Sequence, residues 1–423
     1  MVIDPQDLPL GADMPTGTRF IGREIGASPR WVGPDIPTDE DLSLCVACGL
    51  CLPHCPTYRL TGEESASPRG RIAAMRGVAD GVADVDDTFG RFMDLCLVCR
   101  ACEDVCPSHV PFGRLMERAR TQIEPRRGPG ARFLRWLGLD VVLARPWLIR
   151  LASLFQPVAR PFLPARIRAI TPPRSAPFAR LPRVTEPIGA TRGTVALLSG
   201  CVQDRWFHEV NLATIRVLAR AGWQVDVPRG QRCCGALHSH NGRLDAARRL
   251  ARVNVGAFAG ADVVVVNAAG CGAHLKEYAD LVGAALPVKD LMEFLHDEGG
   301  MEAGALAAPT IVAYHDACHA LRAQGIHAQP RALLGWVGNL ELVEIPDGDR
   351  CCGAAGLYNV TEPEMASQLQ LEKARAVAST GASVVASANP GCSMQLAAGL
   401  AAIGRSDVTV VHPVELLDAA QRP

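Results

Sequence analysis

The spacing of the cysteines constrains this chain more than any other feature of its sequence. The 423 residues include 16 cysteines, and none of them is isolated. The chain opens with MVIDPQDLPLGADMP, which lacks the basic start and apolar core of a secretory signal, so a cytoplasmic location is expected. Cytosolic thiols stay reduced, which favours metal ligands or redox thiols over disulfides. The cysteines form four groups of four: Cys45, Cys48, Cys51 and Cys55; Cys96, Cys99, Cys102 and Cys106; Cys201, Cys233, Cys234 and Cys271; Cys318, Cys351, Cys352 and Cys392.

The first two groups share one compact pattern. Residues 45–56 read CVACGLCLPHCP and residues 96–107 read CLVCRACEDVCP, each a C-x2-C-x2-C-x3-C-P run. Such a run wraps thiolates around a [4Fe–4S] cluster, and in paired runs the fourth cysteine ligates the other cluster. Structural zinc sites use two separated cysteine pairs instead, so two cubane clusters are the favoured interpretation. The predicted ligand sets are Cys45, Cys48, Cys51 and Cys106 for one cluster, and Cys96, Cys99, Cys102 and Cys55 for the other.

The segment between these runs is predicted to be helical. It reads SPRGRIAAMRGVADGV, and its helix is expected to begin after Pro68 and Gly70. Helices around the clusters predict an α-helical ferredoxin domain over residues 41–120, preceded by an N-terminal tail at residues 1–40. Arg69 and Arg71 either offset the negative charge of a cluster or are solvated surface residues, and the sequence leaves both interpretations open.

A basic, apolar connector is predicted over residues 121–190. Between residues 131 and 183 it holds ten arginines and a single acid, Asp140, although the net charge of the whole chain is −1. Apolar residues alternate with these arginines, as in an interfacial amphipathic helix pair broken at Pro146 and Pro157. A linker packed on a partner subunit or on its own domains explains the pattern equally well. Nucleic acid is not expected as a partner, because no base-reading motif accompanies the charge.

The second half of the chain is a duplication. Residues 191–305 and 306–423 repeat one order of motifs: TVALLSGC matches TIVAYHDAC, RGQRCCG matches DGDRCCG, and VVVVNAAGC matches SVVASANPGC. Equivalent cysteines are 117, 118 and 121 residues apart. Short apolar strands alternating with helical segments predict two α/β units with parallel sheets, named here CCG repeat 1 and CCG repeat 2. The expected fold is therefore α+β and multidomain, with the ferredoxin domain first.

The cysteines of each repeat follow predicted strands, where parallel sheets place their ligands. Gly235 and Gly353, directly after the Cys-Cys pairs, allow the backbone to bend close to an inorganic cluster. Inert buried thiols are the alternative. Since all eight cysteines recur in register, one or two further iron–sulfur clusters are expected, with the ligands Cys201, Cys233, Cys234 and Cys271 in repeat 1 and Cys318, Cys351, Cys352 and Cys392 in repeat 2.

These motifs carry a family resemblance over residues 41–420. The segments CVACGLCLPHCPTYRLTGEESASPRGRI, DLCLVCRACEDVCPSHV, LLSGCVQ, GCGAHLKEY and CCGAAGLYN, in this order, resemble the iron–sulfur subunits of bacterial glycolate oxidase. Those subunits are related to the iron–sulfur subunits of lactate utilisation and anaerobic glycerol-3-phosphate dehydrogenase and to the CCG subunits of heterodisulfide reductase. The last of these close each motif with C-x-x-C, whereas this chain has His274 and Gln395 there, which disfavours disulfide chemistry. His274 remains a candidate ligand without a counterpart in repeat 2.

The resemblance implies an iron–sulfur subunit that takes electrons from an FAD-containing 2-hydroxy-acid dehydrogenase subunit and passes them toward a quinone-level acceptor. Two flavin-type subunits accompany such a chain in this family. No dinucleotide-binding loop is found, so flavin and NAD are not expected here and no catalytic residue is assigned. Lactate or glycerol-3-phosphate oxidation, a thiol–disulfide reductase and a metal-stabilised scaffold are the alternatives.

Polar residues near the CCG cysteines are expected to tune cluster potential or to be ordinary strand-end residues. They are His315, Asp316, His319, Lys276 and Glu277.

The apolar run between residues 375 and 405 is punctuated by Gly381 and Pro390, which predicts a strand, a turn and a small-residue helix rather than a membrane span. Peripheral contact with the inner face of the cell membrane remains open.

Overall fold

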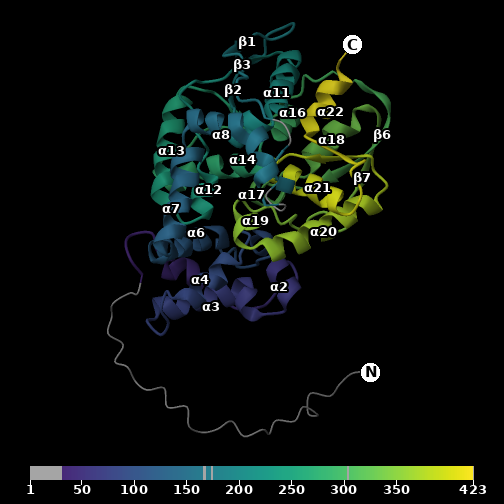
Figure 1. The fold of residues 1–423 in the computed structure, drawn as a ribbon. Coiled ribbons are helices and arrows are strands. Elements are labelled where there is room, and N and C mark those ends of the chain that lie inside the picture. Colours follow the sequence, from purple (N-terminus) through teal and green to yellow (C-terminus); the bar gives the residue numbers. More distant parts are fainter. Residues whose placement is uncertain (1–30, 165–167, 173–174, 303, 423) are drawn as a thin grey trace, which may run out of the picture.

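The computed structural model describes residues 31–164, 168–172, 175–302 and 304–422 (Figure 1). A helical N-terminal domain lies at one end of the molecule, and the two α/β units lie side by side at the other. Most of the predicted tail, residues 1–30, lies outside the described residues. From residue 31 onward the chain packs on the helical domain, since Trp31 is buried in an edge-to-face contact with Phe89, with ring centroids 5.8 Å apart.

The N-terminal domain contains only helices in its described part, as the helical pattern around the cysteine runs predicted. Ser67 caps α3 by accepting a hydrogen bond from the Gly70 amide at 2.9 Å, and Pro68 occupies the first turn. Its core is built on buried methionines and leucines such as Met75, Met93 and Leu115. The helices are α1 (Asp39–Ser43), α2 (Pro56–Thr61), η2 (Glu64–Ala66), α3 (Pro68–Ala79), α4 (Asp87–Asp94), α5 (Ala101–Asp104), α6 (Phe112–Ile123) and η3 (Glu124–Arg126).

The connector is helical and docks on repeat 1 over its first half. The Leu139 carbonyl accepts from His238 Nε2 at 3.0 Å, and Asp140 pairs with Arg243. Arg166 and Arg174 lie outside the described residues. The connector comprises α7 (Pro129–Arg135), the π-helical η4 (Trp136–Leu143), α8 (Pro146–Ala159) and η5 (Arg160–Phe162).

One of the two predicted helix breaks in the connector is absent. Pro146 begins α8 as expected, but Pro157 lies inside this helix, which continues to Ala159. Proline has no amide hydrogen to donate to the carbonyl four residues earlier. Here the hydroxyl of Ser175 donates to the Ser153 carbonyl at 2.9 Å, and this bond satisfies the oxygen that Pro157 leaves unpaired.

CCG repeat 1 is built on a five-stranded sheet in the order β1-β3-β2-β4-β5. β1 runs antiparallel at the edge, and the other strands are parallel, as predicted. β4 is apolar and completely buried, as expected for the centre of a parallel sheet. The elements are β1 (Val184–Thr185), β2 (Gly193–Leu198), α10 (Val202–Trp206), α11 (His208–Arg220), β3 (Trp223–Asp226), α12 (Ala236–His240), α13 (Leu244–Ala257), β4 (Val264–Val266), α14 (Ala269–Lys276), α15 (Tyr278–Val282), β5 (Val288–Asp290) and α16 (Leu291–Glu298).

CCG repeat 2 follows the same path on a four-stranded, entirely parallel sheet in the order β7-β6-β8-β9. The strand, turn and helix predicted between residues 375 and 405 are β8, the bend at residues 388–389 and α21, which begins at Pro390; residues 375–379 end α20 instead. The elements are β6 (Ala305–His315), α17 (Cys318–Gln324), α18 (Ala328–Gly335), β7 (Gly338–Glu344), α19 (Tyr358–Thr361), α20 (Pro363–Ser379), β8 (Val384–Ser387), α21 (Pro390–Ala402), β9 (Thr409–Val411) and α22 (Pro413–Ala420).

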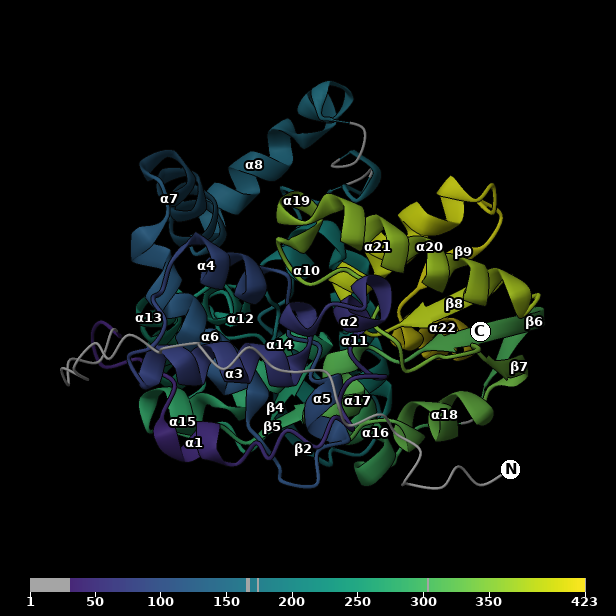
Figure 2. The ribbon, with the colours of Figure 1, turned by 90° about the horizontal axis from the view of Figure 1, so that it is seen from below.

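The two repeats share one apolar core. Helix α11 of repeat 1 packs on α22 of repeat 2, and α16 packs on α18. Leu218, Leu295, Leu333 and Leu417, one from each helix, belong to the same buried cluster. Helices α14 and α17, which carry Cys271 and Cys318, also meet (Figure 2). The duplication therefore brings its two cysteine sets to neighbouring positions at the interface.

Candidate metal centres

The first centre lies in the loop that follows α1. Cys45, Cys48, Cys51 and Cys106 line one small cavity of about 30 Å³, with Cys102 also at its wall. Gly49 has a left-handed backbone with φ of 86°, and a Cβ there would lie 2.9 Å from Nη1 of Arg69. Cys48 is exposed, so this centre lies at the molecular surface.

The second centre is more deeply placed. Cys55, Cys96, Cys99 and Cys102 line a separate cavity of about 20 Å³. The fourth cysteine of each run therefore lies with the first three of the other run, which is the crossed arrangement proposed from the sequence. Val98 and Arg100 have φ values of 53° and 61°, and these left-handed residues turn the loop around the cavity.

The two arginines between the runs differ in environment. Arg71 is completely buried, and its guanidinium donates to the Phe92 carbonyl at 2.7 Å and to the Thr57 hydroxyl at 3.1 Å. Among the described residues no carboxylate pairs with it. Burial raises the pKa of Cys96, and the positive charge of Arg71 opposes that rise. Arg69 is partly exposed and pairs with Glu64 at 2.7 Å. Arg71 therefore supports the interpretation as a countercharge, whereas Arg69 lines the first cavity with its charge already paired to Glu64.

The buried thiols fit a soft metal centre. Burial raises the pKa of Cys102, and that of Cys99 is raised first by its contact with Cys351 and then by burial. Such thiols do not ionise without a nearby cation, whereas a coordinated thiol is deprotonated outright. Four thiols around a cavity favour thiophilic iron over hard cations such as Mg²⁺ or Ca²⁺.

In repeat 1 the four cysteines come together from three strand ends. Sγ of Cys201 lies 3.4 Å from Sγ of Cys233, and Sγ of Cys234 lies 3.1 Å from Sγ of Cys271. Gly235 has a φ of 92°, which is the sharp turn expected after the Cys-Cys pair. The equivalent Gly353 of repeat 2 has a φ of 84°.

In repeat 2 the cysteines meet a buried histidine. Nitrogen of His315 and the Sγ atoms of Cys352 and Cys392 all lie within 4.8 Å of one another. Cys392 accepts from Nδ2 of Asn389 at 3.4 Å. Cys318, at the start of α17, contacts Cys351, and this contact raises the pKa of Cys351. Burial and the nearby Lys373 lower the pKa of His315 to about 3, so its imidazole is neutral.

A central cavity connects these centres. It has a volume of about 420 Å³ and is lined by all eight cysteines of the two repeats and by Cys96 of the second ferredoxin centre. Cys99 and Cys351 also belong to one buried cluster. The second ferredoxin centre therefore lies against repeat 2, and repeat 2 faces repeat 1 across the cavity.

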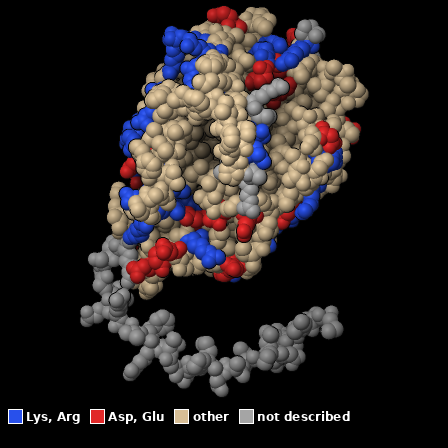
Figure 3. Space-filling model, viewed as in Figure 1, with Lys and Arg blue, Asp and Glu red and all other residues tan. Residues whose placement is uncertain are grey.

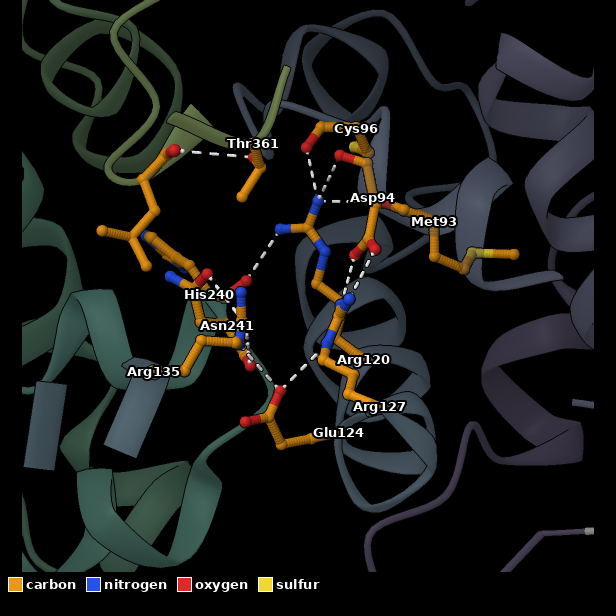
Figure 4. A network of polar contacts seen from close by, with 11 residues as sticks. Met93, Asp94, Cys96, Arg120, Glu124, Arg127, Arg135, His240, Asn241 and Thr361 are labelled. Carbon is orange, nitrogen blue, oxygen red and sulfur yellow. Dashed lines mark hydrogen bonds and ion pairs between the residues drawn. The ribbon is translucent and has the colours of Figure 1, made fainter. Parts of the chain in front are cut away.

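An arginine network fastens the ferredoxin domain to repeat 1 (Figure 4). Arg120 of α6 donates to the carbonyls of His240 at 2.7 Å, of Met93 at 2.8 Å and of Cys96 at 2.5 Å. Glu124 accepts from Arg135 of the connector at 3.0 Å and from Arg243 of repeat 1 at 2.7 Å. These residues were not predicted from the sequence, because single charged residues on a helix carry no motif.

Three of the polar residues flanking the CCG cysteines form ion pairs. Asp316 pairs with Arg331 at 2.7 Å, Lys276 with Glu293 at 2.7 Å, and Glu277 with Arg100 at 2.5 Å. These three are structural ion pairs around the centres.

Three histidines between the domains form a separate cluster. The rings of His240 and His319 lie 5.3 Å apart, and those of His240 and His274 lie 6.4 Å apart. Nδ1 of His240 lies 2.8 Å from a carboxylate oxygen of Glu117. Burial lowers the pKa of His274 to about 4 and raises that of Glu117. His274 lies beside Gly235, where a Cβ would be 3.4 Å from Nε2 of the ring, so it faces the cysteine turn of repeat 1.

Comparison with known families agrees with this division of the chain. The 4Fe-4S dicluster domain matches residues 41–110, and the Cysteine-rich domain family CCG matches residues 195–276 and 312–397. The chain thus carries an iron–sulfur dicluster domain and two cysteine-rich repeats, as the four cysteine groups predicted.

Curated relatives extend this match to nearly the whole chain. The probable glycolate oxidase iron-sulfur subunit of Bacillus subtilis is 38% identical over 417 residues, covering 90% of this chain and 94% of the relative. The glycolate oxidase iron-sulfur subunit of Escherichia coli is 34% identical over 404 residues, covering 91% and 95%. Lactate utilization protein A of Oceanobacillus iheyensis is 30% identical over 235 residues, covering 53% of this chain and 96% of the relative. The chain therefore belongs to the family of glycolate oxidase iron–sulfur subunits.

Proposed function

We propose that this chain is the electron-transferring subunit of a flavin-dependent glycolate dehydrogenase complex. The observation that carries the proposal is the continuity of the cysteine centres. Cys48 of the first centre is exposed, Cys102 lines both ferredoxin cavities, and Cys99 contacts Cys351 of repeat 2. The sixteen cysteines would hold the two ferredoxin clusters in the crossed sets given above and further clusters in the CCG repeats.

Iron–sulfur clusters supply one-electron redox chemistry, whereas removal of a hydride from a 2-hydroxy acid needs a flavin or nicotinamide. Substrate oxidation is therefore assigned to a partner flavoprotein. The residues of this chain hold the centres, exclude water from the inner ones and supply buried positive charge through Arg71. The names of the two relatives that match over most of their length support glycolate as the donor.

The flavoprotein is expected to dock at the first centre. Beside the exposed Cys48, the side chains of Val46 and Leu50 are 70% and 56% exposed. An exposed apolar rim around a redox centre suits a partner that must approach closely and then bury it. This loop is the surface at which electrons enter the chain.

The test uses the complex of this chain with its flavoprotein partner, purified without oxygen. About twelve to sixteen iron atoms per chain, with matching sulfide, are expected for three or four [4Fe–4S] clusters. Addition of glycolate should reduce the clusters, as seen by electron paramagnetic resonance, and the clusters of the isolated chain should stay oxidised. Reduction by lactate or glycerol 3-phosphate alone would overturn the glycolate assignment, and zinc without sulfide would overturn electron transfer.

Connector helix α8 is proposed to contact the membrane surface. None of the described helices is long and apolar enough to cross a bilayer. α8 projects from the molecule beside α7 (Figure 2), and it leaves Trp147, Leu151, Phe155 and Val158 between 44% and 70% exposed at a helical spacing of three to four residues. A single apolar face of this kind, with arginines near it, is typical of interfacial helices.

The described residues form no single-sign charged patch on the face drawn in Figure 3 that would orient the molecule on a membrane. On the face drawn in Figure 3, charged side chains of both signs lie mainly toward the edges, and the middle is mostly uncharged. The complex should therefore sediment with phosphatidylglycerol vesicles through α8. Binding should fall several-fold in a Trp147→Ser, Phe155→Ser double variant and persist in the control Trp336→Ser, whose side chain is also exposed. Equal binding by all three proteins would contradict the proposal.

A further inference from the structure

His315 stands at the carboxyl end of β6, on the strand that leads to Cys318. It is paired in register with Ser387 of β8 and is 1% exposed. Its ring nitrogen and the Sγ atoms of Cys352 and Cys392 lie within 4.8 Å of one another, and all three side chains are buried. In the part of the chain that the structure describes, this is the one group of three or more His, Cys, Asp or Glu side chains with that geometry.

Both ring nitrogens of His315 are buried without a hydrogen-bond partner among the described residues. A buried polar atom without a hydrogen-bond partner has lost its hydration with nothing in exchange, so native structures rarely retain one without a reason. Other buried histidines of this chain have partners: His412 bonds to the Asn267 carbonyl at 3.0 Å, and His238 bonds to the Leu139 carbonyl at 3.0 Å. A coordinate bond to a metal would satisfy one nitrogen of His315.

Repeat 1 has no counterpart at this position. Leu198, 117 residues earlier, takes the place of His315 at the end of β2, where it is 1% exposed. Conversely, repeat 1 has His274 in the position where repeat 2 has Gln395, and Nε2 of Gln395 donates to the Ala366 carbonyl at 3.1 Å. Each set of four cysteines thus has one buried histidine nearby, supplied from a different element.

We propose that His315 is a nitrogen ligand of the metal centre of CCG repeat 2, together with Cys352 and Cys392. The inference rests on the proposed function in so far as the centre is an iron–sulfur cluster. A nitrogen donor that takes the place of one of the four thiolates has a defined consequence, because replacement of cysteine by histidine ligands raises the reduction potential of a cluster. Repeat 2 is therefore the higher-potential member of the pair, and its centre retains electrons that reach it through Cys99.

The test detects the iron–nitrogen bond itself. The full chain is labelled with ¹⁵N-histidine, purified without oxygen and reduced in steps, and pulsed electron paramagnetic resonance records nitrogen coupled to each paramagnetic cluster. A strongly coupled ¹⁵N is expected in the unmodified chain. It should vanish in His315→Cys, which should keep its iron and show a lower midpoint potential. The control His327→Gln, whose side chain is 53% exposed, should keep the signal.

A second variant guards against misfolding. His315→Ala should lose the ¹⁵N signal and regain it when ¹⁵N-imidazole is added. Absence of coupled nitrogen from the unmodified chain, or its persistence in both variants, would overturn the assignment of His315. Either result would leave iron and sulfide in place, whereas failure of the proposed function would appear as a chain that binds no iron and sulfide.

Discussion

The two CCG repeats have the same order of strands, helices and cysteines, yet their centres lie in different electrostatic environments. In repeat 1, Asn254 of α13 is completely buried and donates to the Cys233 carbonyl at 3.1 Å. In repeat 2, the position 119 residues later is Lys373 of α20, which is 3% exposed and donates to the carbonyls of Asp347 and Gly348 at 2.9 and 3.1 Å. A neutral amide side chain in repeat 1 therefore occupies the position of a buried ammonium group in repeat 2.

This difference shows which features a duplicated site keeps. The thiols and the glycine turn are common to both repeats, because the thiols are the candidate ligands and the turn brings them together. The groups behind them diverged, and they decide which charge state the centre favours. Among the described residues, Lys373 has only carbonyl groups as hydrogen-bond partners. A buried cation of this kind stabilises negative charge nearby, so repeat 2 is expected to hold an added electron more strongly than repeat 1.

The largest expected effect comes from removing one thiol from one repeat at a time, which tests whether each repeat holds its own metal centre. Cys234→Ser and Cys352→Ser should each abolish the centre of one repeat, because serine is a poor ligand for iron. The expected loss is about four iron atoms per chain in each variant. Iron and sulfide analysis with electron paramagnetic resonance checks this.

The ferredoxin domain serves as the internal control in both variants, since its clusters use other cysteines. If either substitution left iron content unchanged, the thiol it removes would not be a ligand. Identical spectral losses in the two variants would show that the repeats share a single centre.

The interface between the repeats is expected to depend on Asp418. This carboxylate of α22 is completely buried and receives hydrogen bonds from Arg216 at 2.7 Å and Arg220 at 2.8 Å, both on α11 of repeat 1. The position 122 residues earlier in repeat 1 is His296, whose side chain is 39% exposed. Asp418→Asn should lower the free energy of unfolding by about 2 kcal/mol, because the partly exposed guanidinium groups of Arg216 and Arg220 lose their buried charged partner.

Thermal and denaturant unfolding of the complete chain measure this loss. His296→Asn is the matched control and should change stability by less than about 0.5 kcal/mol. If both variants lost a similar amount of unfolding free energy, Asp418 would contribute no more to the interface than His296, and the prediction would be wrong.

The same carboxylate predicts an acid-sensitive interface. Burial acts to raise the pKa of Asp418, but hydrogen bonds from Arg216, Arg422 and Arg220 outweigh it and hold this pKa at about 2. A carboxyl whose pKa is lowered on folding stabilises the fold above its unfolded pKa of about 3.9 and loses that contribution as pH falls toward 2. The contribution lost should be about 2 kcal/mol.

Unfolding free energies measured between pH 5 and pH 2 reveal this as a difference between the unmodified chain and Asp418→Asn. The gap between the two proteins should narrow as the pH falls. A gap that stayed constant would mean that Asp418 titrates alike in the folded and unfolded chains.

The electrostatic difference itself is tested with Lys373→Met. Loss of the buried ammonium should lower the midpoint potential of the repeat 2 centre by roughly 60 mV, which is a tenfold change in a one-electron equilibrium. A redox titration followed by electron paramagnetic resonance measures the shift. Lys289→Met is the control, since Lys289 is partly exposed and pairs with Asp297 at 3.1 Å. A shift of the repeat 1 signals instead would contradict the placement of Lys373.

Short-range pattern predicted most of this architecture. Cysteine spacing indicated four groups of cysteines and led to the proposal of the crossed ferredoxin sets, because three residues in steps of three can reach one cluster only from a tight loop. Alternation of apolar strands with helical segments predicted two parallel sheets, since such strands must be covered on both faces. The antiparallel edge strand β1 was missed, because Val184–Thr185 is too short to carry a pattern.

The connector shows where local pattern fails. Pro157 was expected to break its helix, but Ser175 replaces the missing donor from 22 residues away in sequence. Likewise, Arg69 and Arg71 are indistinguishable in sequence, yet only Arg71 is buried beside the cysteines. Burial depends on what other segments cover a side chain.

Thiol spacing and turn glycines are local properties of the chain, so the candidate ligands, the duplication and the family could all be predicted before any packing was known. The relation of the centres to one another depends instead on long-range packing. The pairing of α11 with α22 and of α14 with α17 joins residues more than 40 positions apart and encloses one cavity between the repeats. Proximity of Cys99 to Cys351 and of His315 to Cys392 follows from that packing, which no local pattern encodes.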